Sequence, residues 1–399
     1  MTALLLALTM SAGPVQGAAQ PPANAPATKV PAASHASHAT NPEFEKTVKE
    51  AAAARDGGRI DESIALYQKA VKLRPSYVEG YWSLGTAFYE LDKYAEAKDA
   101  FGHVARLQSK HAAAYGFRGL CEFQLKQYDE ALDDLTHSTD LGLNEPKDLV
   151  DAVTYHSAIT FTRLAKYEFA LQTLEKLGRE GNDSPRVIEA FGMALLRIPM
   201  VPSELPADRR EMVMLAGRGA YYRSARNSPA AETAFTLLAE RYPDTPNVHY
   251  ACGVYLVEEQ PDRALEEFNQ ELKISPNHIP SMLQIAFEYL RRSDWEAARP
   301  WAERMVQLDP SDFASRRVLG QVLLETGDTP GAIKQLETGV RLAPDSPSLH
   351  FTLARAYQKA GRQEDAQRER LEFMRLDRLV RSKRQGVQAL GGVGRDPSK

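Results

Sequence analysis

Thiol and imidazole chemistry is the first possibility that the residue types raise. The chain has 2 cysteines and 9 histidines, and His249 lies three residues before Cys252. On a helix this spacing is about one turn, so the imidazole could activate the thiol as a nucleophile. The simpler interpretation makes Cys252, and likewise Cys121, a small buried hydrophobic residue. We favour the simpler interpretation, and we expect no disulfide because the two cysteines lie far apart in the chain.

Other catalytic patterns are missing from the sequence. There is no phosphate-binding glycine loop, no HExxH motif and no GxSxG motif. Two cysteines exclude a cysteine-based zinc cluster, and His35 with His38 lies in an Ala- and Pro-rich stretch where we expect no stable metal site. Paired glutamates such as Glu258 and Glu259 are interpreted as solvated helix faces. We therefore predict no catalytic residue, no cofactor, no metal and no enzymatic activity.

The composition narrows the class of protein. Hydrophobic residues make up 43% and charged residues 26% of the 399 positions, which excludes wholesale disorder. The formal net charge of −4 gives no global sign of a nucleic-acid binder. No apolar run approaches the roughly 18–20 residues that span a bilayer, so we expect no transmembrane helix.

The first 42 residues do not resemble a fold. A short apolar run opens the chain, and Gly17 and Ala19 are spaced like the small residues of a signal-peptide cleavage site. We predict a signal peptide over 1–19 and a secreted or periplasmic location, although no Lys or Arg precedes the apolar run. An uncleaved, disordered N-terminus is the alternative. Residues 20–42, rich in Ala and Pro, should form a disordered linker.

A 34-residue period runs through the rest of the chain. Prolines, alanines and glycines all keep this spacing, which is the signature of a repeat architecture. Within 78–111, apolar residues follow first one and then a second amphipathic helical pattern, separated by a polar turn. One such helix pair cannot bury its apolar faces alone, and stacking on the next pair does so. The periodic residues are Pro276, Pro310 and Pro344; Ala264, Ala298, Ala332 and Ala366; and the glycine pairs Gly85 with Gly119 and Gly219 with Gly253.

These residues resemble the tetratricopeptide repeat (TPR) family. In 78–111 the family pattern is present as Tyr81, Leu84, Gly85, Phe88, Ala97, Phe101 and Val104. The resemblance implies an all-α, superhelical solenoid of about nine helix-turn-helix units with one irregular break. The units are 44–77, 78–111, 112–145, 151–184, 212–245, 246–276, 279–312, 313–346 and 347–378.

The break divides the predicted array into two parts. Residues 185–197 have the pattern of a first helix, but Pro199, Pro202 and Pro206 follow and exclude a regular second helix. We therefore predict an N-terminal array over 43–197, a Pro-rich break over 198–211 and a C-terminal array over 212–378. Whether the break is a rigid bend or a hinge stays open.

The resemblance implies a binding surface on the concave side, which the first helices line. Large apolar side chains at these positions suggest a groove that binds an extended peptide or a helix. The alternative is that the side chains pack on one another. The residues predicted for this surface are Trp82, Thr86, Tyr89, Phe123, Tyr155, Tyr250, Phe287, Phe351 and Arg355. No three consecutive units supply the Lys, Asn and Arg set with which some family members bind acidic chaperone tails, so we disfavour such a ligand.

Basic residues gather at the C-terminal end. Arg378, Arg381, Lys383 and Arg384 precede a glycine-containing segment, and we predict a disordered basic tail over 379–399. A polar cap on the last repeat is the favoured role, and contact with anionic lipid or nucleic acid is the alternative. Together the observations favour a non-enzymatic scaffold that binds a protein or peptide partner, in the bacterial cell envelope if the chain is exported. A self-associating structural module and an accessory subunit of an envelope enzyme are the alternatives.

Overall fold

The computed structural model describes residues 41–144 and 146–391, and these residues form helices and turns without a strand. The predicted signal peptide, nearly all of the predicted linker and the last eight residues lie outside the described residues. In chain order the α-helices are α1 (Pro42–Asp56), α2 (Ile60–Leu73), α3 (Val78–Glu90), α4 (Tyr94–Leu107), α5 (Ala112–Gln124), α6 (Tyr128–Asp140), α7 (Lys147–Arg163), α8 (Tyr167–Arg179), α9 (Pro185–Leu195), α10 (Arg210–Ser224), α11 (Ser228–Arg241), α12 (Val248–Leu256), α13 (Pro261–Ile274), α14 (Ile279–Arg291), α15 (Trp295–Leu308), α16 (Phe313–Glu325), α17 (Thr329–Leu342), α18 (Pro347–Lys359) and α19 (Gln363–Gly391).

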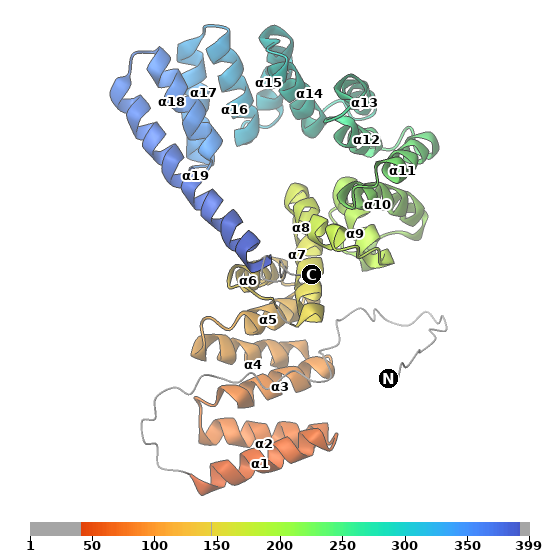
Figure 1. Cartoon of the computed structure of the whole chain (residues 1–399), viewed down its shortest axis with the longest axis vertical. Coiled ribbons are helices and arrows are strands. Elements are labelled where there is room, and N and C mark those ends of the chain that lie inside the picture. The colour runs from red at the N-terminus through yellow and green to blue at the C-terminus, as the bar shows by residue number, and fades with distance from the viewer. Residues whose placement is uncertain (1–40, 145, 392–399) are drawn as a thin grey trace, which may run out of the picture. The chain divides into compact units, whose positions relative to one another are not determined.

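The helices are arranged as consecutive hairpins (Figure 1). Each of the nine predicted repeat units contains two of the helices, which confirms the predicted pairing along the chain. The described residues fall into two compact units. The first comprises 41–177 with Pro199–Ala207, and the second comprises Gly178–Ile198 with 208–391.

Small residues let the two helices of a pair approach closely, as the sequence predicted. A Cβ atom on Gly85 of α3 would lie 2.7 Å from the Phe101 ring of α4. The same relation holds between Gly253 of α12 and Phe268 of α13, at 2.4 Å. The periodic alanines, such as Ala97, are fully buried. An added side-chain atom at these positions would displace a ring from a close-packed core.

A left-handed residue ends the turn between the helices of many pairs. Asp92, Lys126, Ala165 and Ser293 have φ angles between +56° and +60° there. Glycine takes the equivalent position in the first pair and in the last two pairs, as Gly58, Gly327 and Gly361, and Gly327 has φ +96°. Glycine adopts this conformation without the Cβ clash that other residues suffer.

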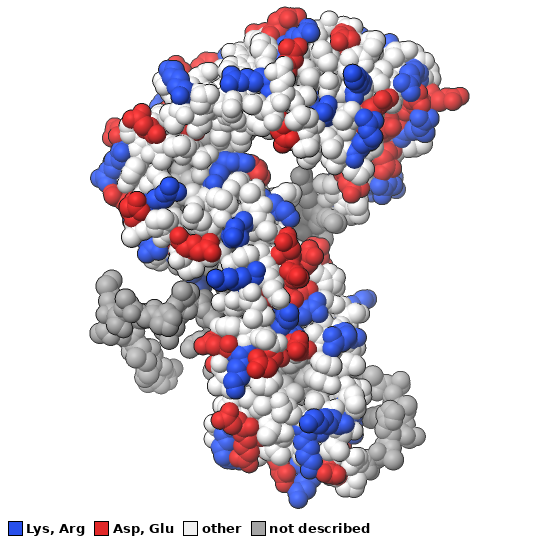
Figure 2. Space-filling model, turned by 180° about the vertical axis from the view of Figure 1, so that it is seen from behind, with Lys and Arg blue, Asp and Glu red and all other residues white. Residues whose placement is uncertain are grey.

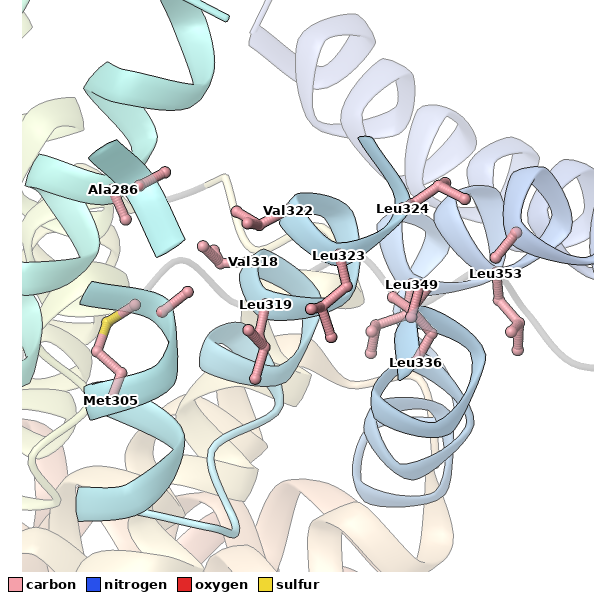
Figure 3. Packing of buried hydrophobic residues seen from close by; sticks show 14 of the residues in the cluster. Ala286, Met305, Val318, Leu319, Val322, Leu323, Leu324, Leu336, Leu349 and Leu353 are labelled. Carbon is pink, nitrogen blue, oxygen red and sulfur yellow. The ribbon is translucent and has the colours of Figure 1, made fainter. Parts of the chain in front are cut away.

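Within each unit, the core consists of clusters of buried hydrophobic residues between neighbouring helices. Figure 3 shows one stretch of it, in which Met305 of α15, Val318 of α16 and Leu349 of α18 belong to a single cluster. From α14 to α19, each first helix packs on its own second helix and on the second helix of the preceding pair. This arrangement is the reason why a single pair could not fold alone.

The predicted break is present. Two 3₁₀ turns, Pro202–Glu204 and Ala207–Arg209, occupy the stretch between α9 and α10 where a second helix would otherwise lie. Within the second unit, α9 packs directly on α10, because Gly192 and Gly217 bring the two backbones together: a Cβ on either glycine would lie 1.9 Å from a carbonyl oxygen of the other helix. In the first unit, the side chain of Arg163 donates a hydrogen bond to the carbonyl of Pro199, 3.2 Å away.

The last helix is longer than the sequence predicted. We expected the array to end at residue 378 and a disordered tail to follow, but α19 continues to Gly391. Residues 379–385 contain no proline and consist mainly of good helix formers, so nothing in them stops the helix. The remainder of the predicted tail, 392–399, lies outside the described residues.

Candidate functional site

Three of the nine predicted surface residues are buried. Tyr89, Tyr155 and Tyr250 expose 3%, 9% and 7% of their surface, so the prediction that they line an open groove is wrong for the isolated chain. The physical reason is the packing that we had weighed as the alternative. The Tyr89 ring lies 5.5 Å from that of Phe117 in the next pair, and burial raises the pKa of the Tyr89 hydroxyl.

Four further residues are half-buried, and three of them are aromatic residues packed on their neighbours. The Trp82 ring lies 5.4 Å from Phe101, 5.0 Å from His111 and 5.6 Å from Phe117. Phe123 packs against His156, with 4.9 Å between ring centroids. Thr86 is the one of the four without an aromatic ring, and its hydroxyl donates a hydrogen bond to the Trp82 carbonyl.

Phe287 of α14 is the last of these half-buried residues. The guanidinium of Arg317, on α16, lies 5.1 Å from the centre of the Phe287 ring. Burial lowers the pKa of Arg317. This cation–π contact links two successive first helices and leaves little of the Phe287 ring for a ligand.

Phe351 and Arg355 are the two predicted residues that remain exposed. They lie four residues apart on α18, so they share one face of that helix. Phe351 is 49% exposed, and its ring centroid lies 5.4 Å from that of Phe373 on α19. Arg355 forms an ion pair with Glu325 of α16 at 2.6 Å. Of the nine predicted residues, these two are therefore the ones that the structure leaves exposed.

A pocket of about 400 Å³ lies beside Arg355. The Lys359 ammonium donates to the carbonyl of Leu324, 2.6 Å away, and Gln358 accepts a hydrogen bond from Arg370. Two basic groups and one carboxylate thus converge on an open hollow. The pocket is lined by Leu324, Glu325, Arg355, Gln358 and Lys359.

The thiol and imidazole chemistry considered from the sequence is not assembled. Cys121 and Cys252 are free and buried, and burial raises the pKa of both thiols. The Cys252 thiol donates to the carbonyl of Phe235. His249 is held elsewhere, with Nδ1 2.6 Å from a Glu267 oxygen and Nε2 2.9 Å from the Pro243 carbonyl. Its pKa is raised because it shares a hydrogen bond with Glu267.

Buried carboxylates are a feature that the sequence analysis missed. Glu271 is fully buried, and its carboxylate accepts from the backbone N–H groups of Asn247 and Tyr250 at the start of α12. Burial, together with the nearby charge of Asp134, raises the pKa of Glu122 to about 8. Arg118 is bound by both oxygens of Asp134. The sequence signal that could have revealed these buried carboxylates is a glutamate at a position where the repeat pattern has an apolar residue.

Metal-binding clusters, membrane-spanning helices and large fields of one charge are three further features that could indicate a function. Among the residues that the structure describes, no cluster of three His, Cys, Asp or Glu side chains could hold a metal ion. None of the described helices combines the length and the apolar character needed to cross a bilayer. On the face shown in Figure 2, basic and acidic side chains are interspersed and do not form one large field of a single sign.

The repeats match established sequence models. A model described as TPR repeat matches residues 53–92 and 320–361, and a model described as tetratricopeptide repeat matches 83–136. With the helix pairs described above, these matches confirm the predicted fold class, an all-α array of tetratricopeptide-type helix pairs with one irregular break.

Known proteins resemble the chain at low identity. The protein O-mannosyl-transferase TMTC3 of Homo sapiens is 22% identical over 300 residues, which are 74% of this chain and 30% of the relative. Hsc70-interacting protein 1 of Drosophila melanogaster is 31% identical over 121 residues, 30% of this chain and 32% of the relative. The chain thus spans about a third of the length of either relative. A structure of MamA from Desulfovibrio magneticus RS-1, 22% identical, covers 40% of this chain and 96% of its own length with a TM-score of 0.36.

Proposed function

We propose that the chain is a non-enzymatic scaffold that binds a partner protein on the concave face of α16 and α18. The observation that carries the proposal is the pair Phe351 and Arg355, which remains exposed on one face of α18 beside an open pocket. An exposed aromatic ring next to an arginine is the combination that anchors protein interfaces. A polypeptide lying across α18 would cover both side chains.

The repeat type and the relatives support a binding role. Tetratricopeptide-type repeats present first helices side by side, which creates a surface suited to extended ligands. One relative is named for its interaction with Hsc70. The name of the other relative, a transferase, gives no support for a transferase activity in this chain, because this chain spans only 30% of that protein. Buried thiols of raised pKa and a histidine held by Glu267 also favour binding over catalysis.

The location of this scaffold is a second part of the proposal. The apolar run and small residues of 1–19 support export to the bacterial cell envelope. Sequencing the N-terminus of the protein isolated from its native cells tests export. A new N-terminus near residue 20 is expected, and an intact Met1 in a cytoplasmic fraction would overturn this part alone.

Binding is tested with a double variant, Phe351→Ala with Arg355→Ala, in the full chain. Tagged wild-type and variant proteins are incubated with native extract, and retained proteins are quantified by mass spectrometry. A specific partner should be reduced at least tenfold by the double variant. Both side chains are exposed, and an exposed ion pair such as Arg355 with Glu325 contributes only about 0–1 kcal/mol, so the fold should persist.

Phe313→Ala is the matched control. Phe313 is 42% exposed and lies at the start of α16, at the opposite end from the pocket-lining Leu324. Its loss should leave partner retention unchanged. Equal loss of the partner in both variants, or in neither, would exclude the α16–α18 surface as the binding site.

A further inference from the structure

We propose that the outer face of the last described helix pair, α18 and α19, is a docking face for an acidic amphipathic α-helix of another protein. The face is defined by Phe351, Leu371, Phe373 and Met374 and is called the end face below. It adds a second surface to the proposed scaffold and shares only Phe351 with the concave surface. The tests below leave Phe351 and Arg355 intact, so the two proposals can fail separately.

A comparison of residues that lie 34 positions apart shows that the end face lacks the covering helix present at earlier pairs. Met374 occupies the repeat position of Leu272, Val306 and Val340, which lie 34 residues apart in turn. Those three side chains are partly buried against the core cluster that includes the following first helices. In the last described pair α19 continues to Gly391 instead of turning into another first helix, and Met374 is 48% exposed.

Phe373, next to Met374, is likewise more exposed than its equivalents in the earlier pairs. Phe373 is equivalent to Glu271, Met305 and Gly339, all of which are buried. At Gly339, an added Cβ would lie 2.7 Å from the side chain of Leu349, on the first helix of the next pair. Phe373 is only half-buried. At Phe373 and Met374 the end face is therefore a surface of the kind that an α-helix covers at the three preceding junctions of this unit.

The aromatic residue of the first helix gives independent support. Trp82 and Tyr250 occupy the position that Phe351 has in the last pair. Each of them is covered by the histidine that caps the next first helix, His111 and His278, with ring centroids 5.0 Å apart in both cases. Phe351 has no such cover. A docked helix that begins over Phe351 and runs along α19 would complete the pattern.

The charge of α19 distinguishes between the possible binding partners of the end face. The sequence from Arg378 to Gly391, called the basic rim below, contains four basic residues and no acidic residue, and one of the four, Arg381, is paired with Asp377 at 2.8 Å. Arg378 is exposed and forms no ion pair among the described residues. An acidic helix would neutralise this rim, whereas a second copy docked through the same face would bring two basic rims together.

A head-to-tail arrangement of copies is also disfavoured. In α1 and α2, at the other end of the described array, no large hydrophobic side chain is exposed. The N-terminal pair of one copy therefore offers the end face of another no apolar surface to bury. A separate partner that presents an amphipathic helix remains the occupant that matches both the apolar register and the basic rim.

The test uses two synthetic probes based on α18, a helix that already covers such a face. Both are fluorescein-labelled, lactam-bridged peptides with the sequence 345–361, which keeps the packing residues Leu349 and Leu353. In the acidic probe, the residues at the positions of Arg355, Gln358 and Lys359 are glutamate, and in the basic probe they are lysine. Fluorescence anisotropy with the full chain should give micromolar binding of the acidic probe and at least tenfold weaker binding of the basic probe.

Variants locate the binding. Met374→Glu, which puts a carboxylate on the end face, should weaken the acidic probe at least tenfold, and Leu371→Ala at least threefold. Leu342→Glu is the matched control, because Leu342 is 43% exposed on α17, outside the end face. Each variant is used only if its melting temperature stays within a few degrees of wild type. Absent binding, equal binding of both probes, or equal effects of Met374→Glu and Leu342→Glu would overturn the proposal.

Two further measurements distinguish the rival occupants. If sedimentation shows a wild-type dimer that Met374→Glu dissociates, the occupant is a second copy and the proposal is wrong. If the protein floats with vesicles containing 30% phosphatidylserine and Met374→Glu abolishes flotation, the end face is a membrane surface and the proposal is again wrong. A monomer that does not float, together with selective binding of the acidic probe, supports the docking of an acidic helix.

Discussion

Two aromatic clusters, one near each end of the array, show how the same repeat position acquires opposite properties. In α3–α5, Trp82 is enclosed by Phe101 of its own pair and by His111 and Phe117 of the next pair. In α18 and α19, Phe351 meets Phe373 of its own pair, and it has no second aromatic partner among the residues that the structure describes. Repeat position sets the direction of the side chain, but the next pair sets its exposure. An aromatic residue at a concave position is therefore a structural residue inside the array and a binding candidate at its end.

The largest expected effect is a difference in stability between these two clusters. Trp82→Ala should destabilise α3–α5 by about 3 kcal/mol, since it removes a large side chain from between three rings and leaves a cavity. Phe351→Ala should cost less than about 1 kcal/mol, because half of that side chain is already in water. Urea unfolding followed by circular dichroism compares the two variants.

Hydrogen exchange adds the local measurement, because repeat arrays need not unfold in one step. Faster exchange should be confined to α3–α5 in Trp82→Ala and should be nearly absent from α18 in Phe351→Ala. Equal destabilisation by both variants would contradict the view that the following pair determines the role of the aromatic residue.

The sequence was sufficient to predict the helix pairs and the break but not the exposure of individual side chains. The spacing of Gly85 and Ala97 predicts close helix crossings because only small residues permit them. The three prolines at 199, 202 and 206 predict the loss of a helix for an equally local reason. The burial of Tyr89 depends on Phe117 in another pair, and no pattern within one repeat contains that information.

Charged groups illustrate the same limit. Glu271 lies in a helix with several other acidic residues, yet it is fully buried and caps the start of α12. The continuation of α19 to Gly391 was underestimated for a different reason, since the predicted helix ended with the last repeat at residue 378 and a glycine-containing tail was expected to follow. A helix interior tolerates a single glycine at a cost of about 1 kcal/mol.

An intermediate effect is expected from two histidines whose pH dependence should have opposite signs. Both ring nitrogens of His249 face acceptors, Glu267 and the Pro243 carbonyl, so the charged form is the better partner, and its pKa is raised. The stabilisation it provides should be complete below the unfolded pKa of about 6.5 and should be lost as the pH rises through the raised folded pKa. His249→Gln should therefore cost about 1–2 kcal/mol at pH 5.5 and less at pH 9.

His111 provides the opposite case in the first unit. Its Nδ1 accepts from the backbone N–H of Ala114, which requires an unprotonated nitrogen, and burial lowers the pKa. The stabilisation should be present above the unfolded pKa of about 6.5 and lost as the pH falls through the lowered folded pKa. Unfolding of wild type, His111→Gln and His249→Gln between pH 5.5 and 9 tests both signs. Parallel pH profiles for the two variants would refute the assignment of protonation states.

The smallest effect concerns the turns inside the pairs, where some pairs use glycine and others a residue with a Cβ for the same left-handed conformation. Ala165, between α7 and α8, has φ +56°, and Gly327, between α16 and α17, has φ +96° with no atom within 4 Å of an added Cβ. Since Gly327→Ala meets no side-chain obstacle, its cost should be that of the backbone conformation alone, about 1 kcal/mol. Ala165→Gly should relieve the corresponding strain and gain about 0.5 kcal/mol, which is smaller because glycine loses more conformational entropy on folding. Differential scanning calorimetry of the two variants measures both changes. If Gly327→Ala were as stable as wild type, the left-handed turn would not be a source of strain in either unit, and the use of glycine in some pairs would need another cause.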